Sequence, residues 1–240
     1  MVYGIIAAGA GSRLKADGYQ GFKPMVPVGG EALIERLIRI FTQNDATAIY
    51  IILNATQKQI GAFIEELPFV KGCPLTILYK DTPSSFHSFY ALADSMAAHH
   101  KTEICISTID PVFREAAFKG YVETFLRNTA LDGLMAVTSF VEDDKPLHVY
   151  TDEDLRITRF TGIPIKRQPW ISGGIYLLRK KALAVAAPAM QAGISKMRNY
   201  QQALLDQGLY LKAYDLGKII DIDHVTDIPL AEALIRPTTI

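Results

Sequence analysis

Runs of apolar residues alternate along this chain with segments whose apolar residues recur at helical spacing. Residues 2–8 and 48–53 are nearly continuous apolar runs, the pattern of strands buried on both faces of a sheet. Residues 31–44 and 57–67 instead have the periodicity of amphipathic helices. This order of strand and helix predicts an α/β fold with parallel strands joined by right-handed crossovers. Ligands of such folds bind at the carboxyl ends of the strands.

The same two patterns continue to the end of the chain. Further strands are expected at residues 75–79, 103–109, 133–140, 172–176 and 210–214, and further helices ending near residue 98 and spanning 112–128, 196–207 and 226–235. Between them, residues 141–170 are more polar and are interrupted by prolines, with short strand-like pieces at 147–150 and 156–160. We interpret residues 141–170 as a lid within a single domain of residues 1–240, a length that suits one α/β domain.

The first predicted strand leads into a loop of small residues, Gly9, Ala10, Gly11 and Ser12. Small or missing side chains permit unusual backbone angles and close approach of a ligand. Such a loop can direct several backbone N–H groups at phosphate oxygens. Arg13 and Lys23 then supply two positive charges, and together these features suggest a triphosphate site. The loop alone is equally compatible with an α/β protein that binds no nucleotide.

Two familiar nucleotide-binding motifs are excluded at this loop. A dinucleotide fingerprint needs a third glycine where Leu14 stands. A P-loop needs lysine after Gly9, where Ala10 stands.

Carboxylates stand at two places where a cation is expected. Asp110 follows the predicted strand 103–109, where a hard oxygen ligand suits Mg²⁺. The alternative is that Asp110 caps a helix whose first residue is Pro111. Near the end of the chain Asp221 and Asp223 alternate with isoleucines, so an extended segment places both on one side. Two carboxylates on one side either share a cation or face solvent.

Two further pairs of small residues have two interpretations each. Ser84 and Ser85 precede the helix that ends near residue 98, and they either cap it or offer hydroxyl groups to a base or ribose. Gly173 and Gly174 lie in the strand at 172–176, where they either form a bulge or let a ligand approach the backbone.

Composition narrows the classes of partner. The 25 lysines and arginines balance the 25 aspartates and glutamates, so total charge gives no argument for nucleic acid or an anionic membrane surface. No apolar stretch is long enough to span a bilayer, and the first residues lack the basic start of a signal peptide. Cys73 and Cys105 are not spaced as metal ligands and are expected as reduced thiols. We therefore expect a cytoplasmic protein without nucleic-acid or membrane partners.

The residues around the small-residue loop resemble a known signature. Residues 6–14 read IAAGAGSRL and residues 23–25 read KPM, which is similar to the nucleotidyltransferase pattern LAAGxGSRL followed by KPM or PKP. Residues 27–38, 107–113 and 220–233 resemble later parts of the same pattern. The chain thus resembles the sugar-1-phosphate nucleotidyltransferases, including their phosphocholine cytidylyltransferase-like members.

This resemblance implies a fold and an activity. The fold would be a three-layer αβα, Rossmann-like (GT-A-like) nucleotidyltransferase fold around a mixed, mostly parallel sheet. The activity would be Mg²⁺-dependent transfer of a nucleotidyl group from a nucleoside triphosphate to a sugar-1-phosphate or similar small phosphorylated acceptor, with release of pyrophosphate. Residues 141–170 would then form the lid on the acceptor side.

The resemblance also implies roles for individual residues. Lys23 and Arg13 would be catalytic, and Asp110 would bind the metal together with Asp221 or Asp223. The nucleotide-binding residues would be Ala7, Ala8, Gly9, Gly11, Ser12, Arg13, Pro83 and Ser85. The acceptor-binding residues would be Gly173, Gly174 and Lys166.

Three other functions stay open at this point. One is a glycosyltransferase on a related fold, although its central Asp-x-Asp motif is replaced here by Ile109-Asp110-Pro111. The others are a molybdenum-cofactor-type guanylyltransferase, which shares the glycine loop, and a non-catalytic nucleotide-binding protein. The nucleobase, the acceptor and the oligomeric state are not predicted.

Overall fold

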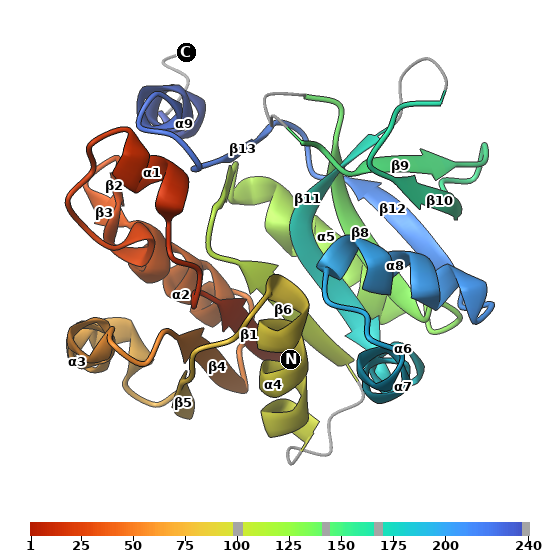
Figure 1. The fold of residues 1–240 in the computed structure, drawn as a ribbon, viewed down its shortest axis with the longest axis horizontal. Coiled ribbons are helices and arrows are strands. Elements are labelled where there is room, and N and C mark those ends of the chain that lie inside the picture. The colour runs from red at the N-terminus through yellow and green to blue at the C-terminus, as the bar shows by residue number, and fades with distance from the viewer. Residues whose placement is uncertain (98–102, 141–144, 166–169, 237–240) are drawn as a thin grey trace.

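The computed structural model describes residues 1–97, 103–140, 145–165 and 170–236 (Figure 1). A nine-stranded sheet runs through this part of the chain. Its strands are β1 Val2–Ile6, β4 Ala48–Leu53, β5 Leu75–Tyr79, β6 Glu103–Thr108, β8 Gly133–Thr138, β9 His148–Thr151, β10 Ile157–Thr161, β11 Trp170–Arg179 and β12 Leu211–Asp215. Their order is β10-β9-β11-β6-β1-β4-β5, with β8 beside β11 and β12 beside β8.

One half of the sheet is purely parallel and the other half is mixed. β5, β4, β1 and β6 run parallel, so their carboxyl ends meet at one edge. β11 runs antiparallel to β6 and joins this half to β8 and β9. The prediction of a mixed sheet in an α/β fold is therefore confirmed.

Helices cover both faces of the sheet (Figure 1). One face carries α2 Leu33–Gln43, α3 Lys58–Glu66 and α5 Ala116–Arg127, and the other carries α4 Ser85–Ala97, α6 Lys180–Ala184, α7 Ala186–Gln191 and α8 Met197–Asp206. β1 serves both cores, because Tyr3 and Ile5 pack with the first set of helices while Val2 and Ile6 pack with the second. Burying each such side chain contributes about 1.5–3 kcal/mol. The three-layer αβα arrangement follows from this two-sided burial.

Short elements lie near the carboxyl ends of the parallel strands. They are α1 Ser12–Ala16, the 3₁₀ turn η1 Lys23–Met25, the hairpin of β2 Pro27–Val28 and β3 Glu31–Ala32, and the pair of β7 Pro111–Phe113 with β13 Ile219–Asp221; a second 3₁₀ turn, η2 Pro68–Val70, follows α3. The last helix, α9 Asp227–Ile235, packs beside β2 (Figure 1). The beginning, middle and end of the chain therefore meet in one region.

Most of the predicted elements are present, and the differences are local. The strand expected at 2–8 ends at Ile6, and the helix expected at 112–128 begins at Ala116. Residues 111–113 form β7 instead, because they pair with β13 from the far end of the sequence. Asp110 is consequently not a helix cap. The short helices α1, α6 and α7 were not predicted.

The segment expected to form a lid is partly described. Residues 145–165 contribute β9 and β10 to the edge of the main sheet, while residues 141–144 and 166–169 lie outside the described part. The role of residues 141–170 as a lid stays a prediction. Among the helices that the structure describes, none is long and apolar enough to cross a membrane.

Candidate active site

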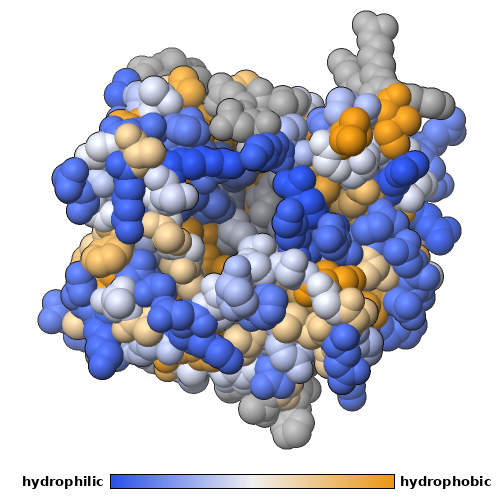
Figure 2. Space-filling view, in the orientation of Figure 1, coloured by the Kyte–Doolittle hydropathy of each residue, from blue (hydrophilic) through white to orange (hydrophobic). Residues whose placement is uncertain are grey.

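A cavity of about 750 Å³ opens where the parallel strands end. Figure 2 shows a hollow in the middle of this face of the molecule. The parts of the chain that line the cavity include the loop after β1, η1, the start of α4, the end of β6, the segment after β13 and Arg198 of α8. The lining includes Ala8, Gly9, Gly11, Ser12, Arg13, Lys23, Pro83, Ser85, Asp110 and Asp223. Among the predicted nucleotide-binding residues only Ala7 does not line the cavity, because it is buried in the core.

The loop after β1 has the backbone that its glycines permit. Gly11 has φ +60°, and a Cβ at this position would lie 3.2 Å from Cβ of Lys23. Both the left-handed backbone and the short distance favour glycine here. A Cβ at Gly9 would meet no atom within 4 Å, so this side of the loop is open to the cavity. The loop is thus tight against Lys23 and open toward a ligand.

Lys23 lies at the centre of the polar residues in the cavity. It begins η1 and is only 8% exposed. Its Nζ atom lies 2.8 Å from Oδ2 of Asp110 and 2.7 Å from Oδ1 of Asp223. One ammonium group therefore holds two carboxylates from distant parts of the sequence.

Strand pairing explains why the two carboxylates meet. Asp110 stands between β6 and β7, and Asp223 stands just after β13. Antiparallel pairing of β7 with β13 sets Pro111 opposite Asp221. The N–H of Ile222 then donates to the carbonyl of Asp110 at 3.0 Å. This register brings Asp223 beside Asp110.

The segment after β13 is also fastened to α1. Nη1 of Arg13 donates to Oδ2 of Asp223, so both oxygens of this carboxylate are bound by cations. One residue further on, Nδ1 of His224 lies 2.8 Å from Oδ2 of Asp17. The backbone N–H of Asp223 donates to Asp227 at 2.9 Å, which fixes the turn that carries the carboxylate.

The close charges determine the protonation states. Burial by itself lowers the pKa of the Lys23 ammonium, but Asp110 and Asp223 raise it by more, so the net pKa lies above its ordinary value. Burial likewise raises the pKa of Asp110, but the Lys23 ammonium, together with hydrogen bonds from Thr108 and the backbone, brings the net pKa below its ordinary value. Lys23 and Asp110 are therefore both charged near neutral pH.

The carboxylates fit a hard divalent cation. Oxygens of Asp110 and Asp223 already converge on one positive atom, Nζ of Lys23, at hydrogen-bonding distances. In the described residues no group of three or more His, Cys, Asp or Glu side chains is placed to hold a metal. The protein would therefore supply two carboxylates and leave the remaining positions to water and phosphate, which is the usual arrangement for Mg²⁺.

Asp221 and Asp223 are placed differently. The extended segment ends at Asp221, and the N–H of Asp223 donates back to the carbonyl of Asp221 at 3.0 Å. This tight turn removes the strict alternation expected for residues 218–223. Asp223 reaches Lys23, whereas Asp221 lies near Tyr176, whose pKa is raised first by burial and then by the charges of Asp110 and Asp221. Of the two, the structure brings Asp223 to Asp110.

The two serines at the start of α4 have separate places. Oγ of Ser84 hydrogen-bonds Nδ1 of His87 at 2.8 Å and also donates to the carbonyl of Ser195. Ser84 is thus engaged at the helix start, as expected of a capping residue. Ser85 is exposed and lines the cavity, as Pro83 does. Pro83 and Ser85 are thus the exposed residues that this segment contributes to the lining.

Gly173 and Gly174 form a bulge in β11. The register of β11 against β8 shifts between Ser172 and Tyr176. Gly174 has φ +71°, and a Cβ there would lie 2.5 Å from Oγ1 of Thr108. The bulge interpretation is therefore correct, while contact with an acceptor stays a prediction. Lys166 lies outside the described residues.

The family of the chain follows from a match to a family model. The model of the MobA-like NTP transferase domain matches residues 4–161, which include the glycine loop, Lys23 and Asp110. The chain belongs to the MobA-like NTP transferase family. An enzyme of the nucleotidyltransferase type is thereby established. No curated protein matches the sequence.

Solved structures similar to this family member share its whole fold. A candidate glucose-1-phosphate thymidylyltransferase from Bacillus anthracis, in complex with a sucrose, has a TM-score of 0.81 and 21% identity, covering 100% of this chain and 97% of its own. The inositol-1-phosphate CTP transferase from T. maritima has a TM-score of 0.79 and 17% identity, covering 99% and 97%. The nucleoside-diphosphate-sugar pyrophosphorylase from Vibrio cholerae RC9 has a TM-score of 0.72 and 17% identity, covering 96% and 99%. At these identities the likeness shows the fold alone.

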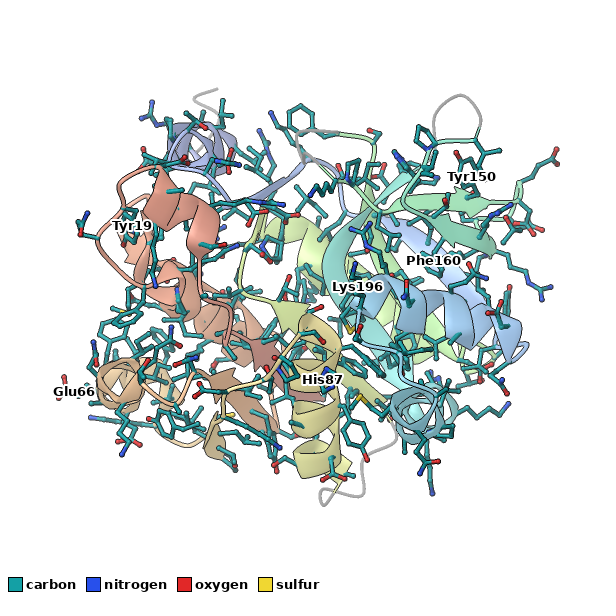
Figure 3. The ribbon with its side chains drawn as sticks, in the orientation of Figure 1. Tyr19, Glu66, His87, Tyr150, Phe160 and Lys196 are labelled. Atoms are coloured by element: carbon teal, nitrogen blue, oxygen red, sulfur yellow. The ribbon has the colours of Figure 1, made fainter. Side chains whose placement is uncertain are left out.

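A second cavity of about 420 Å³ adjoins the first in this family member. The two share Ser85, Thr108, Asp110, Lys145, Arg198 and Asp223. The second extends between β11 and the start of α8, where it is also lined by Gly174, Tyr176, Lys196 and Gln201. Figure 3 shows Lys196 at the start of α8, between this helix and α4. Two ligand spaces therefore meet at Asp110 and Asp223.

Sequence reasoning missed the α8 residues of this second cavity. The helix at 196–207 was predicted, but a helical pattern does not show which of its polar residues face a ligand. The one available signal was the pair of cations Lys196 and Arg198 at the beginning of that helix, with no acidic residue before Asp206. Cations at this end are unfavourable for the helix dipole, which indicates another use for them.

Proposed function

We propose that this chain is a Mg²⁺-dependent nucleotidyltransferase that joins the nucleotidyl group of a nucleoside triphosphate to a small phosphorylated acceptor such as a sugar-1-phosphate. The observation that carries the proposal is the convergence of Asp110, Asp223 and Lys23 at the junction of two cavities. The larger cavity has the glycine loop of a triphosphate site, and the smaller has cations suited to a second anion. A reaction between two phosphorylated molecules needs two such neighbouring anion sites.

In the proposed reaction an oxygen of the acceptor phosphate attacks the α-phosphorus of the triphosphate. A new P–O bond forms, the bond from the α-phosphorus to the bridging oxygen breaks, and pyrophosphate leaves with its electron pair. A phosphate oxygen is already ionised near neutral pH, so no side chain has to remove a proton. Catalysis then depends on positioning and on neutralising charge.

Residues of the larger cavity would bind the triphosphate. Backbone N–H groups of the Gly9 to Ser12 loop would contact its phosphates, and Arg13 would add a planar cation. Asp110 and Asp223 would hold Mg²⁺, which supplies charge neutralisation at the phosphates when bound. Pro83 and Ser85 at the start of α4 would contact the nucleoside.

Lys23 would neutralise the negative charge that grows at the α-phosphate in the transition state. In the structure its ammonium contacts two carboxylates. These contacts use two of the three N–H donors of the ammonium, so contact with a phosphate requires that the third donor turn toward it or that one carboxylate be exchanged. The four-carbon stem and the adjoining glycine loop make this movement feasible, whereas Pro24 fixes the point from which the stem begins.

The experiment is a pyrophosphate-release assay with four nucleoside triphosphates, each combined with a panel of phosphorylated acceptors and Mg²⁺. At least one pair should turn over, and the activity should be lost with EDTA and in Asp110→Asn. Release of pyrophosphate from no pair would refute the proposal. Activity that persists in Asp110→Asn would remove Asp110 from the metal site.

One second candidate is favoured by the matched family description, MobA-like NTP transferase domain. It is guanylyl transfer to a phosphorylated cofactor precursor, which uses the same glycine loop. The same assay separates the two, because this candidate requires GTP and shows no turnover with any sugar or cyclitol phosphate.

A further inference from the structure

The second cavity contains a buried polar group that has no hydrogen-bond partner among the residues that the structure describes. Gln201 lies on α8, is 2% exposed and lines this cavity. Its amide oxygen Oε1 is buried, and within the described residues it accepts no hydrogen bond. Buried side-chain oxygens in native proteins are nearly always hydrogen-bonded. A ligand that donates a hydrogen bond would satisfy this oxygen.

Two cations of the same lining stand at the beginning of this helix: Arg198 on α8 and Lys196 just before it. Arg198 precedes Gln201 by three residues, a spacing that puts both on one face of α8. Nη2 of Arg198 donates to the carbonyl of Lys145 at 3.1 Å. Within the described residues, neither Arg198 nor Lys196 forms an ion pair with a carboxylate. Their charges can therefore bind an anion.

The positions of these side chains indicate where two parts of a ligand would bind. Arg198 lines both cavities, so it lies at their junction near Asp110 and Asp223. Gln201 and Tyr176 line the second cavity and not the first. A ligand with its anionic group at Arg198 would place its body against Gln201.

We propose that α8 selects the acceptor: Arg198 and Lys196 bind its phosphate, and Gln201 accepts a hydrogen bond from a hydroxyl group on its body. The proposal rests on the proposed function and specifies its acceptor as a polyhydroxylated phosphomonoester. Gln201 is then a specificity-determining residue.

The same cavity is unsuited to a phosphorylated quaternary amine. Such a group is usually held by several aromatic faces, and Tyr176 is the one aromatic side chain among the described residues of this lining. Lys196 and Arg198 would repel the cationic head, and a trimethylammonium group has no hydrogen to donate to Gln201. Hydroxylated acceptors should therefore be preferred to phosphocholine.

The first test compares acceptors on the wild-type enzyme. The probes are glucose-1-phosphate, inositol-1-phosphate, their monodeoxy analogues and phosphocholine, used in the turnover assay and in ligand-detected NMR binding without triphosphate. We expect binding and turnover of a hydroxylated probe, and a loss of about tenfold in kcat/KM for one deoxy analogue, the scale of one neutral hydrogen bond. A preference for phosphocholine would overturn the inference and leave the proposed function intact.

The second test uses variants of α8. Gln201→Leu should abolish the discrimination between the hydroxylated acceptor and that deoxy analogue, a change that loss of packing would not produce. Arg198→Met should raise the KM for the acceptor at least tenfold and leave the KM for triphosphate nearly unchanged. Asn199→Leu, exposed on the same helix, is the matched control. If Gln201→Leu keeps the discrimination, or if no hydroxylated probe binds, the inference is wrong. Binding without pyrophosphate release would instead contradict the proposed function.

Discussion

Nζ of Lys23 lies 2.7 Å from Oδ1 of Asp223, a residue 200 positions later in the chain. The same ammonium lies 2.8 Å from Oδ2 of Asp110. Two carboxylates that both lie within hydrogen-bonding distance of one atom would repel each other without a cation between them. If Asp110 and Asp223 hold Mg²⁺ as proposed, the ammonium of Lys23 lies where the ion would bind and competes with it for the two carboxylates.

This competition predicts the effect of removing Lys23 on metal affinity. Lys23→Met should bind Mn²⁺ roughly tenfold more tightly than the wild type in the absence of triphosphate, because Asp110 and Asp223 lose the cation between them and Asp223 keeps only Arg13. Electron paramagnetic resonance of free Mn²⁺ measures this affinity directly. Lys15→Met, on the exposed side of α1, is the control. Unchanged or weaker Mn²⁺ binding in Lys23→Met would show that the ammonium does not occupy the ion's position.

The two aspartates near the end of the chain should differ in their effect on metal binding. Asp223→Asn should weaken Mn²⁺ binding by roughly tenfold or more, because it removes one of two charged ligands. Asp221→Asn should change it much less, since Asp221 lies beside Tyr176 and not at Lys23. Titration of both variants with Mn²⁺ measures the two affinities. A larger loss of affinity in Asp221→Asn than in Asp223→Asn would identify Asp221 as the second metal ligand.

Arg13 should act mainly in triphosphate binding. Arg13→Ala should raise the KM for triphosphate by roughly tenfold or more, the scale of a charge-assisted hydrogen bond, with a smaller effect on kcat. The measurement is steady-state kinetics at saturating acceptor, with Lys15→Ala as the control. A normal KM would indicate that Arg13 serves only to hold Asp223.

The sequence was sufficient to predict the sheet, the glycine loop and the candidate residues Lys23 and Asp110. Apolar periodicity is a local property, and the parallel strands and their helices follow from it. The pairing of β7 with β13 is not local, so the sequence pattern predicts a helix from residue 112 where the structure has β7. The sequence left the choice between Asp221 and Asp223 open for a related reason, because strict alternation holds only while a strand continues, and β13 ends at Asp221.

The second cavity illustrates a different limit. The helix that carries Arg198 and Gln201 was predicted from its pattern, but their roles depend on which side of the helix faces β11. That relationship is set by packing of Tyr200 against Phe86 and Phe89, residues more than a hundred positions earlier. Only the folded arrangement shows that a buried amide and two cations share one space.

The most direct test is the turnover of Lys23→Ala at saturating triphosphate and acceptor. If Lys23 neutralises charge that develops only in the transition state, kcat should fall roughly 100-fold or more while triphosphate binding weakens far less. Lys23→Arg should restore little activity, because a planar guanidinium does not reproduce a compact ammonium on a flexible stem. A Lys23→Ala enzyme with the wild-type kcat would contradict the central role assigned to this residue.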